Sequence, residues 1–189
     1  MPFFGDKCFC FTKTTPAFLF MKITEAQIWQ LLEQVSDPEI PVLSVVDLGI
    51  VREVLFLPPN NPSVDANAVE IVITPTYSGC PAMNAIEIDI KSALQDAGIV
   101  AKVRTVLSPA WTTDWLSENG RQKLKKYGIA PPEKESNDKN ALFLNPQKPA
   151  CPQCDSHNTQ QISAFGSTAC KALYRCLDCL EPFDYFKCH

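Results

Sequence analysis

Between residues 23 and 128 the apolar positions recur first with helical and then with strand spacing. Residues 28–35 carry an apolar side chain every three or four positions, which predicts an amphipathic helix. Thr24, followed three residues later by Gln27, predicts a capping box at its start, and Asp37-Pro38 predicts its end. The apolar stripe consists of Ile28, Leu31, Leu32 and Val35.

The rest of this region predicts three strands and two more helices. Residues 51–57 and 69–73 read as strands joined by a turn rich in proline and asparagine. Residues 83–94 return to helical spacing, residues 99–107 alternate as a third strand, and residues 113–127 predict a last helix. The order α-β-β-α-β-α predicts a small α+β domain whose helices lie on one face of its sheet.

The cysteines are concentrated at the other end of the chain. Six of the nine lie in the last 39 residues, and four form the pairs Cys151-Pro-Gln-Cys154 and Cys176-Leu-Asp-Cys179, with 21 residues between the pairs. Two such turns supply the four thiolates of a tetrahedral Zn²⁺ site, with a β-hairpin between them. We therefore predict a structural zinc ribbon. Iron in the same thiolate shell, or two disulfides in a secreted module, are the alternatives.

The sequence divides into four segments. Residues 21–130 hold the α+β domain, and residues 150–189 hold the ribbon, which is too small to fold without its metal. Residues 131–149 contain four prolines and several charges, which predict a linker. Residues 1–20 are rich in phenylalanine and lack periodicity, so we predict an unstructured extension upstream of a native start at Met21. A hydrophobic docking arm is the alternative.

Charge and hydropathy narrow the class of partner. The net charge of −4 and the pI of about 5.2 argue against a nucleic-acid binder, because phosphate contacts need a basic face. No apolar run approaches the roughly 20 residues of a membrane span, so no membrane partner is expected. Nine cysteines without a signal peptide indicate a cytoplasmic protein that uses them as thiols and metal ligands.

Cys80 is the thiol most suggestive of chemistry. It precedes Pro81, and proline favours the first position of a helix, so we predict Cys80 as the N-cap of the helix that follows. The positive end of a helix dipole there would lower the pKa of the thiol and favour the reactive thiolate. The alternative is a buried cysteine that only packs.

Three carboxylates and two surplus thiols complete the candidates. Asp37, Glu39 and Asp47 lie in an apolar, proline-punctuated stretch. They either share a pocket with Cys80 or, for the two aspartates, hydrogen-bond loop N–H groups as Asx turns. Cys170 and Cys188 exceed the four ligands of a zinc site, so they either pack within the ribbon or react.

Several short motifs resemble the MIP18 (DUF59) family of iron–sulfur assembly factors. The resemblance covers residues 23–128 and implies a small α+β domain that assists the maturation of metal clusters in a partner. It also implies that Cys80 is the functional cysteine and that Asp37 and Glu39 belong to the acidic motif. The matching segments are Asp37-Pro-Glu-Ile-Pro41, Val46-Asp-Leu-Gly49, Thr74-Pro-Thr-Tyr-Ser-Gly-Cys-Pro81 and Pro109-Ala-Trp111.

The tail adds a second resemblance. Residues 165–176 and 181–189, together with the segment Trp111-Thr-Thr-Asp-Trp115, are similar to the PaaD (also called PaaJ) components of the bacterial phenylacetyl-CoA epoxidase system. That resemblance implies a non-catalytic accessory subunit for ring epoxidation in aerobic phenylacetate degradation. Its partners would be the other epoxidase components, above all the reductase that carries flavin and a [2Fe–2S] cluster. An iron–sulfur cluster bound in passing would be its cargo.

Two other functions stay open at this point. One is a structural subunit that bridges the oxygenase components and carries no cluster. The other is an enzyme that uses Cys80 as a nucleophile on CoA esters, which lacks a convincing general base because both histidines lie in the metal-binding tail.

Overall fold

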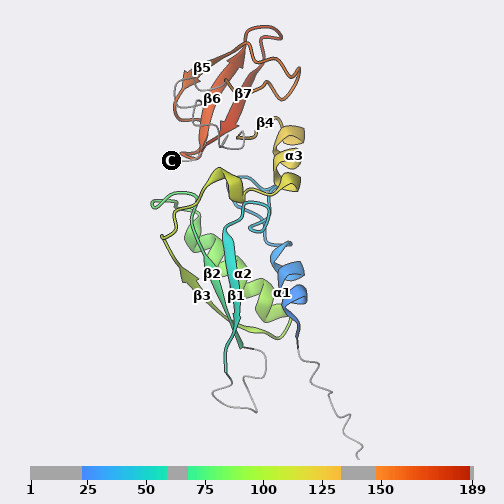
Figure 1. Cartoon of the computed structure of the whole chain (residues 1–189), viewed down its shortest axis with the longest axis vertical. Helices are drawn as coiled ribbons and strands as arrows, with labels where there is room; N and C mark the ends of the chain where they lie inside the picture. The colour runs from blue at the N-terminus through green and yellow to red at the C-terminus, as the bar shows by residue number, and fades with distance from the viewer. Residues whose placement is uncertain (1–22, 59–67, 133–147, 188–189) are drawn as a thin grey trace, which may run out of the picture.

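The computed structural model describes residues 23–58, 68–132 and 148–187 (Figure 1). The predictions for residues 1–20, for Cys188 and for most of the 131–149 linker lie outside these described residues.

The first domain is built on a three-stranded sheet in the order β1-β2-β3. Strand β1 (Val51–Phe56) pairs antiparallel with β2 (Ala68–Ile73), and β2 pairs parallel with β3 (Val100–Thr105). The parallel pair needs a crossover connection, which α2 (Met83–Asp96) supplies. Helix α2 runs along one face of the sheet with α1 (Glu25–Leu32) packed beside it (Figure 1). The α+β prediction is confirmed.

Helix α1 begins as predicted but ends early. The Thr24 hydroxyl accepts a hydrogen bond from the backbone N–H of Gln27 at 3.3 Å, and the Gln27 side chain accepts one from the Thr24 N–H at 2.9 Å. The helix stops at Leu32, so the prediction that it continues to Asp37 is wrong. Val35 is nevertheless buried, because its carbonyl accepts the N–H of Val45 at 2.9 Å and holds the following loop against the core.

The predicted last helix is two elements. A 3-10 turn, η1 (Thr113–Trp115), precedes α3 (Glu118–Tyr127), and the chain is extended at Leu116 between them. Ser117 interrupts the helix because its hydroxyl accepts the N–H of Gly120 at 2.8 Å and acts as the N-cap of α3. Helix α3 lies beyond the end of the sheet and next to the C-terminal ribbon, not on the sheet face with α1 and α2 (Figure 1).

The ribbon forms a second sheet that recruits chain from the first domain. Its strands are β5 (Thr159–Ser163), β6 (Lys171–Cys176) and β7 (Pro182–Phe186). Strand β4 (Ile129–Ala130), directly after α3, pairs parallel with β7, which gives the order β4-β7-β6-β5. The first domain therefore contributes an edge strand to the ribbon.

The two parts also share apolar packing. Phe186 is 1% exposed and meets the ring of Trp111 edge-on, with 5.9 Å between ring centroids. Trp111 is fixed in turn because its indole N–H donates to the carbonyl of Leu48 at 2.8 Å. An edge-to-face pair of this kind contributes about 1 kcal/mol of stability beyond the contribution of the apolar area that it buries. The ribbon therefore packs against the loops of the first domain that hold Trp111 and Leu48.

Among the helices of the described residues, none is both long and apolar enough to cross a membrane.

Candidate functional site: a zinc centre and a thiol cluster at the domain junction

The four paired cysteines of the tail converge as the spacing predicts. Their sulfur atoms all lie within 4.8 Å of one another, and no other group of three or more such side chains in the described part of the chain does so. Cys151 Sγ lies 3.7 Å from Cys179 Sγ, and Cys154 Sγ lies 3.6 Å from Cys176 Sγ. Tetrahedral Zn–S bonds of about 2.3 Å put the sulfurs about 3.8 Å apart, so the donor set fits Zn²⁺.

Local backbone geometry makes the two turns equivalent. Each pair is followed by a residue with positive φ, which is Asp155 at 59° and Leu180 at 68°. At the second turn the N–H of Cys179 points to Cys176 Sγ at 3.5 Å. Hydrogen bonds of this kind, from Cys179 first, lower the pKa of Cys176 to about 6 and favour the thiolate that a metal requires.

Cys80 lies in the loop between β2 and α2, but it is not the N-cap that we predicted. Helix α2 starts at Met83 with Ala82 before it, so the thiol stands outside the first turn. Burial raises the pKa of Cys80 above its ordinary value of 9.0, and the charges of Glu39 and Asp37 add to the rise. The prediction of a lowered pKa is therefore wrong. The effect of these two charges indicates that Cys80 lies near both carboxylates.

Asp37 and Glu39 lie on the loop after α1 and use their side chains differently. The Asp37 carboxylate is buried and accepts the N–H groups of Glu39 at 2.9 Å and Ile40 at 2.7 Å, which is an Asx turn. Burial raises the pKa of Asp37 above 3.8, although those two hydrogen bonds act to lower it. Glu39 is half-buried, and its Oε2 lies 3.5 Å from Cys170 Sγ.

Cys170 reaches this loop from the ribbon, 131 residues further along the chain. It is 5% exposed and belongs to the apolar core of the first domain. Its sulfur contacts the hydroxyl of Thr168 at 3.0 Å. Burial, opposed by that contact but reinforced by the charge of Glu39, raises the pKa of Cys170 to about 11. The sequence marked this cysteine as surplus, and the fold brings it to the carboxylate.

Two further groups at the junction were missed. Burial and then the neighbouring Cys80, Glu39 and Cys170 raise the pKa of Tyr77 to about 12, so its phenol lies among them. Lys171 is 6% exposed and lies close enough to act on Asp37 and Cys170. Their sequence signals were weak: Tyr77 stands three residues before Cys80, and Lys171 directly follows Cys170.

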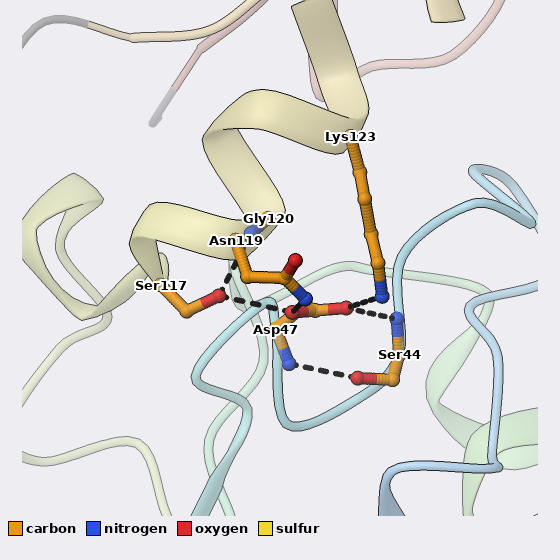
Figure 2. Close-up of polar contacts among 6 residues, drawn as sticks. All are labelled: Ser44, Asp47, Ser117, Asn119, Gly120 and Lys123. Atoms are coloured by element: carbon orange, nitrogen blue, oxygen red, sulfur yellow. Dashed lines mark hydrogen bonds and ion pairs between the residues drawn. The ribbon is translucent and has the colours of Figure 1, made fainter. Parts of the chain in front are cut away.

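Asp47 belongs to a different network. Its carboxylate accepts hydrogen bonds from Ser117 at 3.0 Å, from Asn119 at 2.9 Å and from the Ser44 N–H at 3.3 Å. The ammonium of Lys123 lies 2.5 Å away (Figure 2). Burial alone would raise the pKa of Asp47, but these donors outweigh it and lower the pKa to about 2. The side chain thus joins the 44–50 loop to the start of α3.

Within the described residues the histidine is His157, in the ribbon. Its Nδ1 lies 3.1 Å from the carbonyl of Lys148, and the four cysteines converge without it. No imidazole therefore stands beside Cys80 in the described part of the chain.

Comparison with known proteins agrees with this two-part organisation. Residues 25–107 match a family model described as "Iron-sulfur cluster assembly protein", and residues 135–187 match one described as "PaaD zinc beta ribbon domain". Over 104 residues the chain is 33% identical to an "Fe-S protein maturation auxiliary factor" of Porphyromonas gingivalis, covering 53% of this chain and 90% of that one. A crystal structure titled "Domain of Unknown Function DUF59 from Bacillus anthracis" is 29% identical, with a TM-score of 0.46, and covers 53% of this chain and 90% of that one.

A longer match spans both parts. The chain is 47% identical over 163 residues to an Escherichia coli K12 protein that is named as the D component of a "Putative 1,2-phenylacetyl-CoA epoxidase", covering 86% of this chain and 92% of that protein. The chain belongs to the PaaD family of phenylacetyl-CoA epoxidase components, with a MIP18 (DUF59)-type iron–sulfur assembly domain followed by a zinc ribbon.

Proposed function

We propose that this protein is a non-catalytic accessory subunit of a phenylacetyl-CoA epoxidase system that helps to install the [2Fe–2S] cluster of the reductase component. Its relatives are named either as an epoxidase component or as Fe–S maturation factors, and this chain is similar to both. The specific assignment to the reductase rests on the family resemblance, which implies a reductase component that carries a [2Fe–2S] cluster.

The observation that carries the proposal is the surroundings of Cys80. A half-buried thiol lies within electrostatic reach of two carboxylates, Asp37 and Glu39, at the edge of the first domain. Thiolate and carboxylate groups are iron ligands, and iron binding would displace the proton that burial keeps on the Cys80 thiol. A site of this kind holds metal only with an incomplete protein shell, which suits a cargo that must be passed on.

The zinc ribbon takes a supporting role in this function. Its four thiolates form a closed shell, and closed shells serve structure while open ones serve reaction or transfer. Its Phe186 packs against Trp111 and its strand β7 pairs with β4, so the ribbon is held against the first domain. Residues for ring oxidation are not apparent in the sequence, which has neither Glu-x-x-His pairs for a di-iron centre nor a GxGxxG dinucleotide motif.

A transfer assay tests the proposal. The zinc-loaded chain is reconstituted anaerobically with ferrous iron and sulfide, re-purified, and mixed with reductase stripped of its cluster. We expect the [2Fe–2S] signal to appear on re-isolated reductase, and we expect Cys80→Ser protein to give no more than iron and sulfide alone. The Glu87→Gln variant, changed on the exposed face of α2, is the matched control. Equal transfer by wild-type and Cys80→Ser protein would instead favour a bridging subunit that carries no cluster.

A further inference from the structure

The junction between the domains places a second thiol at the Cys80 site. Cys170 directly precedes β6 in the ribbon, yet its sulfur lies 3.5 Å from Oε2 of Glu39, on the loop after α1. Burial and then the charges of Cys80, Glu39 and Cys170 raise the pKa of Tyr77, so both thiols lie near the same side chain. Two thiols and a carboxylate from three segments therefore face one region.

We propose that Cys170 is a second thiolate ligand for the iron–sulfur cargo, alongside Cys80 and with Glu39 as a carboxylate ligand, so that these three ligands come together only when the ribbon is docked. This inference rests on the proposed function, because it assigns ligands to the same cargo. The ribbon then contributes chemistry as well as structure.

These three groups do not form a compact site for a single ion. The ligand atoms of Cys80, Cys170 and Glu39 do not all lie within 4.8 Å of one another, whereas those of the zinc site do. A polynuclear cluster spreads its ligands over more than one iron and accepts the wider spacing. Stable clusters of this type use four cysteines, so two thiolates per chain hold one loosely and leave positions for the recipient.

A cation borders the same region. The residue Lys171 is 6% exposed, directly follows Cys170, and its charge acts on Asp37 and Cys170. With Glu39 it also lines an open groove of about 460 Å³ between the ribbon and the end of α3. A thiolate-bound iron–sulfur cluster carries negative charge, so a nearby ammonium would favour its binding.

The fixed position of Cys170 also favours a ligand role. The backbone carbonyl of Cys170 accepts the N–H of Lys187 at 2.9 Å, which ties it to the end of β7. The neighbouring Phe186 packs against Trp111 of the first domain. Docking of the ribbon and delivery of Cys170 to Glu39 are therefore one event.

Reconstitution of three full-length proteins with ferrous iron and sulfide separates the possibilities. Wild-type, Cys80→Ser and Cys170→Ser chains are compared by iron and sulfide content, by thiolate-to-iron absorbance and by retained zinc. Serine keeps a hydroxyl that can hydrogen-bond Glu39 and Thr168, so the fold should survive. Thr168→Val, which removes the contact with the Cys170 sulfur but keeps the thiol, is the matched control.

We expect wild-type and Thr168→Val protein to take up iron and sulfide with one zinc retained, and each Cys→Ser variant to retain at least fivefold less iron after gel filtration. Cys170→Ser protein with wild-type iron content and absorbance, beside an iron-poor Cys80→Ser protein, would overturn the role of Cys170 and leave the proposed function standing. Failure of the wild type to bind iron, or iron gained only as zinc is lost, would overturn both.

A second measurement covers the case in which Cys170→Ser protein does not fold. Wild-type chain, with and without the cluster, is alkylated over hours at about pH 9.5, where both thiols ionise more readily, and modified peptides are quantified by mass spectrometry. Protection of both Cys80 and Cys170 by the cluster is expected. Protection of Cys80 with an unchanged rate at Cys170 would overturn the inference.

Discussion

Replacement of Asp47 by Asn should weaken the fold and leave iron binding by the folded protein unchanged. The wild-type carboxylate is buried and receives three hydrogen bonds and the ammonium of Lys123. The amide of Asn keeps the shape but removes the charge and one acceptor. Its NH₂ group would then face the donors that surround the wild-type carboxylate.

The expected magnitude follows from the pKa and from the donors. A shift of the Asp47 pKa from 3.8 to about 2 corresponds to roughly 2 kcal/mol in favour of the charged form. We reduce this to about 1 kcal/mol because Lys123 is 41% exposed and its charge is screened. A buried donor left without an acceptor costs a further 1–3 kcal/mol, roughly. The free energy of unfolding should therefore fall by about 3 kcal/mol.

The pH dependence gives an independent check of sign. The folded-state pKa of Asp47 lies below its ordinary value, so the charged form stabilises the fold fully above about pH 4. That contribution is lost as the pH falls toward about 2. The stability difference between wild type and Asp47→Asn should thus be constant near neutrality and shrink in acid.

Urea denaturation followed by tryptophan fluorescence measures the effect, since Trp111 is buried and its indole N–H donates to the carbonyl of Leu48, the residue after Asp47. Glu87→Gln makes the same chemical change in an exposed i,i+4 pair with Lys91 and should alter stability by no more than about 0.5 kcal/mol. If Asp47→Asn were as stable as Glu87→Gln, the structural role of Asp47 would be refuted. If Asp47→Asn lost iron uptake while fully folded, Asp47 would belong to the functional site.

Three further outcomes are expected. Chelation should release one zinc per chain and expose Cys151, Cys154, Cys176 and Cys179 to thiol reagents, and a ribbon that stays protease-resistant without metal would contradict this. Gly49→Ala should destabilise the protein severely, because a Cβ at φ +65° would stand 2.2 Å from the carbonyl oxygen of Trp115. Gly79→Ala should be tolerated, because its Cβ would meet its nearest neighbour at 3.9 Å. Thermal melts compare the two variants. Alkylation of Cys80 in cluster-free protein should be slow at neutral pH and rise with pH, because its pKa is raised; rapid modification near pH 7 would revive the helix-cap interpretation.

Local pattern was enough to predict most elements and the four-cysteine cluster. The capping box at Thr24, the alternating strands and the two CxxC turns each depend on residues that are neighbours in sequence. The errors arose where a side chain some distance away decides the local structure. Ser117 divides the predicted last helix because its hydroxyl serves both the N–H of Gly120 and the carboxylate of Asp47.

The junction site could be predicted only in part. Cys80, Asp37 and Glu39 were named from short motifs, but the direction of the Cys80 pKa was wrong. The start of α2 lies beyond Pro81, and burial near carboxylates replaces the expected helix dipole. The contact between Glu39 and Cys170 spans 131 residues and depends on how the ribbon docks, which no local spacing encodes.

The central claim is that this protein loads the reductase by means of Cys80. The most direct measurement is the [2Fe–2S] content of reductase purified from cells that produce all epoxidase components with either the wild-type or the Cys80→Ser form of this chain. We predict normal amounts of every component in both strains, with reductase from the Cys80→Ser strain poor in iron and sulfide and weak in the electron paramagnetic resonance signal of its reduced cluster. Fully loaded reductase from the Cys80→Ser strain would contradict the account.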